Sequence, residues 1–237
     1  MFGNNILFFE FRGPFGIPIQ IANSILLLVL FYIWMAGSDI LWALGVVSIL
    51  LVSIVLHELG HGWAAQVQGV PVRRIVIHGG GGFCERKRAA SAYEQEFIVA
   101  MGPIVNLAIW AVASLWADVM WAGIFVDANL AENPQELFAG PRAQAAEWLS
   151  MIAYINGFLA LFNLIPVQPL DGGKLLQLIL LRLVSARAAL RVTGAIGLAL
   201  SVIWIPAMLL IYWSGGWLLF FIPSIPYHWA LMQGRLA

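Results

Sequence analysis

Five long stretches of this chain are almost free of charged side chains. They cover residues 13–38, 40–72, 97–117, 148–170 and 192–234, and Glu58 is the only charged residue in them. A transmembrane helix needs about 20 apolar residues. The last stretch is about twice that length and is broken near its middle by Ser214, Gly215 and Gly216. Because a bilayer tolerates only backbone whose polar groups are bonded internally, we predict an all-α polytopic membrane protein with about six transmembrane helices.

The composition agrees with this class and excludes others. Hydrophobic residues make up 62% of the chain and charged residues 10%, against about 25% charged residues in soluble domains. The formal net charge is zero, so nothing indicates nucleic acid as a partner. The single cysteine, Cys84, excludes an internal disulfide framework and a cysteine-rich zinc site, and we interpret it as a packed, idle thiol. The first apolar stretch lacks a prompt small-residue cleavage pattern, so we expect a retained span and not a signal peptide.

The basic residues predict the orientation in the membrane. With six spans, 11 of the 12 Lys and Arg residues fall on the N-terminus, the connections 67–93 and 171–191, and the C-terminus, whereas Arg142 alone falls on the other side. Basic residues accumulate on the cytoplasmic side. We therefore expect a multi-pass protein of a prokaryotic cytoplasmic membrane with both termini in the cytoplasm. The opposite connection, 118–147, is expected to form a short surface helix and a loop.

An HExxH pattern, His57-Glu58-Leu59-Gly60-His61, lies inside the second apolar stretch. On a helix the two histidines project from one face and can share a Zn²⁺, and the Glu58 carboxylate can take a proton from the attacking water. If the helix begins near Leu41, His57 lies about 24 Å along a hydrocarbon core of about 30 Å, nearer the cytoplasmic face. A polar contact with a neighbouring helix would explain the costly intramembrane Glu58, but it would not explain two histidines at metal spacing.

A catalytic zinc site usually has a third protein ligand. His78 follows the strand-like residues 72–77, and His228, beside Tyr227 and Trp229, fits an interfacial position better. Asp171 is the preferred candidate, because its span runs in the same direction as the HExxH span and both deliver their polar groups near the cytoplasmic face. Prolines 166 and 169 break the helix just before it. An ordinary turn before Gly172 and Gly173 is the alternative for Asp171.

These residues resemble a known family. The HExxH segment together with residues 163–172, Asn-Leu-Ile-Pro-Val-Gln-Pro-Leu-Asp-Gly, looks like the two signatures of the site-2 proteases, intramembrane zinc metalloproteases of peptidase family M50 whose second motif reads NxxPxPxxDG. Residues 102–106 also match the family's weaker GxxxN element. The resemblance covers about residues 41–174, the catalytic core of a single transmembrane metalloprotease domain spanning 1–237. The chain resembles a compact member, with room for neither a PDZ nor a CBS domain.

The resemblance implies a site and an activity. It implies one Zn²⁺ per chain bound by His57, His61 and Asp171, with Glu58 as general base. Asn163 and Asn106 are implied as polar helpers that stabilise the site or hold substrate. The implied activity is hydrolysis of peptide bonds within the transmembrane segments of membrane-anchored substrates. The implied partners are single-span membrane proteins, lipid and a regulatory membrane protein.

Short strands are expected at residues 6–11, 17–19, 72–77 and 83–85, which are rich in β-branched and aromatic residues. They predict a small membrane-associated sheet near the cytoplasmic face, as in the family. An exposed strand edge could capture an unwound substrate by β-augmentation, or the sheet could only plug the site. Both interpretations stay open.

Two other functions use the same ligands. One is a zinc-binding transporter or sensor, although transporters tend to show internal repeats or paired broken helices, and the sequence has only one broken span and one HExxH segment. The other is a catalytically silent protein that binds transmembrane helices. Glu58 argues against it, because metal binding alone does not need that carboxylate.

Overall fold

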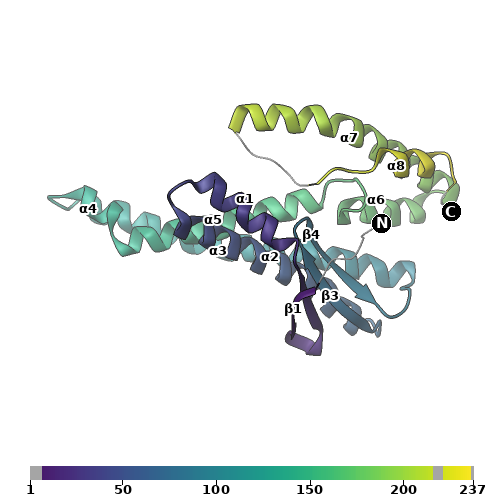
Figure 1. The fold of residues 1–237 in the computed structure, drawn as a ribbon, viewed down its shortest axis with the longest axis horizontal. Helices are drawn as coiled ribbons and strands as arrows, with labels where there is room; N and C mark the ends of the chain where they lie inside the picture. Colours follow the sequence, from purple (N-terminus) through teal and green to yellow (C-terminus); the bar gives the residue numbers. More distant parts are fainter. Residues whose placement is uncertain (1–6, 216–220, 236–237) are drawn as a thin grey trace.

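The fold consists of long helices and one four-stranded sheet (Figure 1). The computed structural model describes residues 7–215 and 221–235. The sheet has the order β1-β2-β3-β4; β2 and β3 pair in parallel and the outer pairs are antiparallel. The predicted strands are confirmed within the described residues, whereas residue 6 lies outside them. The strands are β1 (Leu7–Arg12), β2 (Pro18–Ala22), β3 (Val72–His78) and β4 (Gly81–Arg86).

The sheet packs directly on α2 (Ile40–Val67), the helix that contains the HExxH segment. Leu59, which lies between Glu58 and His61, is buried in one cluster with isoleucines of β2, β3 and α1 (Ile25–Ala36) and with Ile17, which precedes β2. A Cβ atom added at Gly62 would lie 2.8 Å from Ile17 Cδ1, so the close approach depends on this glycine. The buried isoleucines are Ile17, Ile19, Ile25, Ile75 and Ile77.

The first predicted span differs from the structure. The stretch 13–38 forms a 3₁₀ turn (Pro14–Gly16), β2 and only 12 residues of helix in α1. Such a helix is about 18 Å long, shorter than a hydrocarbon core of about 30 Å. α1 packs along α2 as a hairpin, and the Asp39 carboxylate caps α2 by accepting a hydrogen bond from Trp42 N at 3.0 Å.

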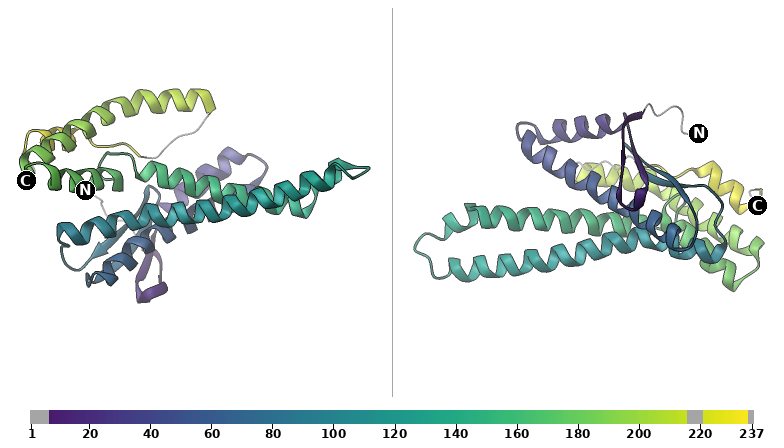
Figure 2. Two further views of the ribbon diagram at one scale, coloured as in Figure 1. Left: turned by 180° about the vertical axis from the view of Figure 1, so that it is seen from behind. Right: turned by 90° about the horizontal axis from the view of Figure 1, so that it is seen from below.

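Two long helices, α3 (Ala92–Ala128) and α5 (Pro141–Asn163), run side by side, as both views of Figure 2 show. A capping box between Ser91 and Glu94 begins α3. The connection 118–147 is therefore shorter than expected: α3 continues through the exposed Asp118, and only α4 (Pro134–Ala139) and short loops separate α3 from α5. An ion pair of 2.6 Å between Arg142 and Asp127 joins the two helices near this end.

The C-terminal third contains α6 (Asp171–Leu183), α7 (Ala186–Gly215) and α8 (Ile225–Met232). Within the described residues, four helices are long and apolar enough to span a membrane: α2, α3, α5 and α7. The count of six is not confirmed, because α1 is short and the predicted last span falls partly on residues 216–220, outside the described part. α8 has eight residues and packs against the first half of α7, where Gly197 leaves room for the His228 ring.

Candidate metal centre

The two histidines of the HExxH segment meet on the inner face of α2. His57 and His61 are buried, with 5% and 8% of their surface exposed, and their Nε2 atoms lie 3.1 Å apart. Residues four apart on a helix share one face, as the sequence predicts. Gly102 of α3 allows this arrangement: a Cβ atom there would lie 2.6 Å from His57 Nε2 and would also overlap the His61 ring.

Asp171, the first residue of α6, reaches both histidines. Its Oδ2 atom lies 3.1 Å from His57 Nε2 and 3.1 Å from His61 Nε2, and the residue is 5% exposed. The loop 164–170 separates α5 from α6 and turns tightly over Gly172 and Gly173, where added Cβ atoms would overlap the backbone of Leu164 and Val167. The sequence left an ordinary turn as the alternative explanation of Asp171. The turn is present, and it brings the Asp171 carboxylate to the two histidines.

One position of this loop departs from the NxxPxPxxDG pattern, since Gln168 stands where the pattern has its second proline and Pro169 follows. Gln168 connects the loop to its neighbours. Its side chain accepts a hydrogen bond from Tyr227 of α8 and donates to Gln177 of α6. Its backbone carbonyl lies 3.1 Å from His228 Nε2.

The three ligand atoms fit a zinc ion. Two Nε2 atoms and one carboxylate oxygen are each 3.1 Å from the other two. Ligands about 2.0–2.1 Å from a tetrahedral zinc lie about 3.3 Å from one another, and two histidines with one carboxylate form a common catalytic donor set. Among the described residues, this is the group of His, Cys, Asp and Glu side chains arranged to hold a metal.

The second nitrogen of each histidine is also bonded. His61 Nδ1 donates to the Ile98 carbonyl of α3 at 2.7 Å. His57 Nδ1 donates to Asn106 Oδ1, also on α3, at 2.6 Å. Such contacts fix the ring and leave Nε2 free for a metal. Asn106 therefore lies behind His57, and its contacts are with protein.

Asn163 and His78 lie apart from this group. Asn163 ends α5, and its side chain donates to the Leu159 carbonyl of its own helix at 2.9 Å. His78 ends β3, its Nδ1 accepts a hydrogen bond from Gly80 N, and partial burial lowers its pKa. His228, expected at an interface, is instead fully buried among protein atoms. Of the candidate third ligands, the structure brings only Asp171 to the two histidines.

The β3–β4 hairpin covers Glu58, which is itself 6% exposed. A Cβ atom at Gly82 of β4 would lie 2.7 Å from Glu58 Cγ and 3.1 Å from its Oε1. Part of the glycine run 79–82 is thus a close contact with the carboxylate. Cys84, two residues on, is half-buried, and burial together with the nearby Glu58 charge raises the pKa of its thiol to about 12.

Two buried polar residues near the site were missed by the sequence analysis, Ser53 and Asn156. A signal existed for Ser53, since it precedes His57 by one helical turn. For Asn156 the one signal in the sequence was its position as a polar residue inside an apolar stretch.

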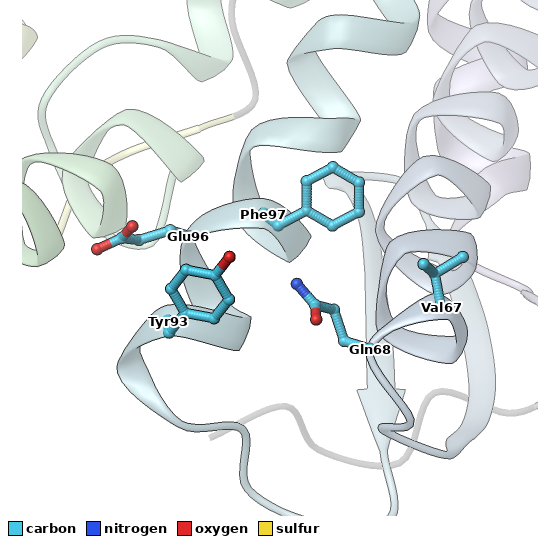
Figure 3. A pocket seen from close by; sticks show the side chains of 5 residues that line it. All are labelled: Val67, Gln68, Tyr93, Glu96 and Phe97. Atoms are coloured by element: carbon cyan, nitrogen blue, oxygen red, sulfur yellow. The ribbon is translucent and has the colours of Figure 1, made fainter.

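Five residues outside the group of His57, His61 and Asp171 line a pocket (Figure 3). It is formed by Val67 and Gln68 at the end of α2 and by Tyr93, Glu96 and Phe97 at the start of α3. The Glu96 carboxylate forms a two-contact ion pair with Arg182 of α6, at 2.7 and 2.6 Å. This acidic group therefore ties α3 to α6.

The chain belongs to peptidase family M50, whose sequence profile matches residues 45–138 and 137–204. It is similar to the zinc metalloprotease MJ0392 of Methanocaldococcus jannaschii, with 29% identity over 190 residues, 79% of this chain and 50% of that protein. It is also similar to the putative zinc metalloprotease sll0528 of Synechocystis, with 32% identity over 176 residues, 69% of this chain and 41% of that protein.

The chain spans about half the length of the curated relatives it matches; for stage IV sporulation protein FB of Bacillus subtilis, 27% identical over 184 residues, the shares are 77% of this chain and 53% of that protein. The fold resembles that of a solved structure, the site-2 protease from Methanocaldococcus jannaschii. The TM-score is 0.55, with 24% identity and coverage of 95% of this chain and 92% of the other.

Proposed function

We propose that the protein is an intramembrane zinc metalloprotease of the site-2 type, which hydrolyses peptide bonds within transmembrane segments of membrane-anchored substrates. The observation that carries the proposal is the triangle of His57, His61 and Asp171 ligand atoms, 3.1 Å on each side. His57, His61 and Glu58 lie on α2, which is apolar and long enough to span a membrane.

Each residue of the site has a role in this proposal. His57, His61 and Asp171 hold the zinc. The ion, when bound, polarises the scissile carbonyl and lowers the pKa of water. Glu58 accepts the proton of the attacking water and delivers it to the leaving amine, which is the work of a general base and then a general acid. Burial of Glu58 beneath the β3–β4 hairpin keeps bulk water away from it.

Asn106 and Asn163 have different roles. Asn106 supports His57 from behind, in line with its 2.6 Å contact with that ring. Asn163 is the last residue of α5, at the edge of the loop that leads to Asp171, and we propose that its amide stabilises the reacting carbonyl or holds substrate. Loss of cleavage in Asn163→Ala with unchanged zinc binding is the expected result.

The orientation proposed from the basic residues is supported by the sheet. β2 pairs in parallel with β3, so residues 18–22 and 72–78 lie on one side of the membrane. In this arrangement α1 leads away from that side, and α2 leads back to it. At the other end, α8 contacts Gln168 in the loop that leads to Asp171, so α8 lies on the same side in this proposal. We propose that this side is the cytoplasm of a prokaryotic cell and that about six segments cross or enter the membrane.

We propose the remaining features from the resemblance to the family. Residues 1–237 contain one transmembrane metalloprotease domain with its core at about 41–174, its substrates are single-span membrane proteins, and a membrane protein regulates it. The test measures zinc content and cleavage of a panel of single-span proteins in proteoliposomes. The proposal requires about one zinc per chain and cleavage within a membrane segment. Zinc without any cleavage would favour the silent helix-binding protein, and zinc uptake into the vesicles would favour a transporter.

A further inference from the structure

Three buried polar side chains join α2, α3 and α5 behind His57, opposite the ring edge that faces Asp171. Asn106 of α3 and Asn156 of α5 are fully buried, and Ser53 of α2 is 3% exposed. The peptidase chemistry assigns nothing to Asn156 or Ser53. Because polar groups in an apolar interior are unfavourable unless they are hydrogen-bonded, their bonds indicate what they do.

The hydrogen bonds form a continuous relay. Asn106 Oδ1 accepts from His57 Nδ1 at 2.6 Å, and Asn106 Nδ2 donates to Asn156 Oδ1 at 2.8 Å and to the Ser53 carbonyl at 3.4 Å. Asn156 Nδ2 in turn donates to Ser53 Oγ at 2.9 Å and to the Ile152 carbonyl at 2.9 Å. Each amide nitrogen has two N–H groups, so both asparagines use all their donors.

Backbone carbonyls set the direction of this relay, because a carbonyl only accepts hydrogen bonds. The Ile152 carbonyl requires Asn156 to turn Nδ2 toward it, which leaves Asn156 Oδ1 facing α3. Asn106 must then turn Nδ2 toward that oxygen and toward the Ser53 carbonyl, which leaves Asn106 Oδ1 facing His57. Reversing either amide would set two acceptor oxygens against each other. His57 Nδ1 must therefore carry the proton, and its Nε2 keeps the lone pair.

We propose that Asn156 and Ser53 are positioning residues that act through Asn106 to hold His57 in the tautomer and ring orientation that bind the metal. The proposal rests on the zinc site described above. His61 achieves the same state directly, through the Ile98 carbonyl. Since α5 also leads into the loop that ends at Asp171, the position of α5 sets two of the three ligands.

The test measures the zinc dissociation constant of the full chain by competition with a chelator, and the visible spectrum of the Co²⁺-substituted protein, which reports the geometry of the ligands. Asn156→Leu removes the relay at its start. We expect zinc binding to weaken about 10- to 100-fold, as for other residues that support a ligand, with a changed Co²⁺ spectrum. Ser53→Ala removes one acceptor and should weaken binding less, in the same direction.

Two control variants match these changes. Ser48→Ala makes the same substitution in α2, where the hydroxyl donates to the Leu44 carbonyl of its own helix. Ser150→Ala removes a bond between α5 and Trp121 of α3, far from His57. Both should keep the wild-type zinc affinity and spectrum, whatever they do to thermal stability.

Asn156→Asp separates positioning from packing. A neutral carboxylic acid can accept from Asn106 and donate to the Ile152 carbonyl, so this variant should bind zinc more tightly than Asn156→Leu and regain the wild-type Co²⁺ spectrum. Wild-type affinity and spectrum in Asn156→Leu would overturn the proposal, and Ser53→Ala decides if that variant does not fold. A wild-type chain that binds no zinc would instead overturn the proposed function, together with this proposal.

Discussion

Gly102→Ala is predicted to damage the metal site without touching a ligand. The added methyl group would lie 2.6 Å from His57 Nε2, about 1 Å inside the usual separation of non-bonded heavy atoms. Either α3 must move away from α2 or the histidine rings must turn. Metal–ligand distances tolerate only about 0.2 Å, so a movement of this size removes a ligand from its place.

The expected loss of zinc affinity in Gly102→Ala follows from the free-energy cost of overpacking. An extra methyl group in a packed interior costs about 1–3 kcal/mol, which corresponds to about 5- to 150-fold in zinc affinity if the strain is relieved at the metal site. The assay is chelator competition with purified protein, beside a thermal melt. Gly45→Ala is the matched control, since its methyl group would meet the Trp148 ring, 2.9 Å from Cζ3, near the far end of α2. Wild-type zinc affinity in Gly102→Ala would refute the reasoning.

Three further predictions concern the ligands, the topology and the cysteine. Asp171→Ala should lower zinc occupancy while His78→Ala keeps it, because only the former removes one of three ligands; metal analysis showing the reverse would make the assignment wrong. In a Cys84→Ala background, a cysteine placed at Arg88 should resist a membrane-impermeant thiol reagent in intact cells and one at Glu136 should react; labelling at Arg88 from outside would reverse the topology. In the wild type, the pKa of about 12 for Cys84 leaves little thiolate at pH 8, so alkylation should accelerate up to pH 11, whereas levelling off near pH 9.5 would indicate an ordinary thiol.

Local patterns predicted the parts of the fold whose physics is local. The runs of β-branched and aromatic residues predicted the four strands. The spacing of His57 and His61 predicted that they share one face of a helix. The short α1 was missed because β2 and the 3₁₀ turn use half of an apolar stretch that charge alone cannot subdivide. The length of α3 was missed because the charge of Asp118 predicts the end of an apolar stretch, whereas an exposed carboxylate does not end a helix.

The contacts behind the site depend on how helices rotate against each other. Asn156 reaches Asn106 only because α3 and α5 present these residues to one another, and one sequence holds no direct signal of that register. His228 shows the same limit. Its aromatic neighbours indicate an interface, whereas Gly197 of α7, 31 residues earlier in the chain, opens the space in which it is buried. The ligand assignment itself stays a prediction until metal binding is measured.

Glu58→Gln tests the central claim most directly. The amide keeps the size of the side chain and cannot accept the proton of the attacking water, and general-base catalysis contributes about 10²- to 10⁴-fold to rates. The measurement is cleavage of a single-span substrate in proteoliposomes, with zinc content and thermal stability determined on the same preparation. The account predicts unchanged zinc and fold with cleavage reduced by at least about 100-fold. Wild-type cleavage by Glu58→Gln would contradict it.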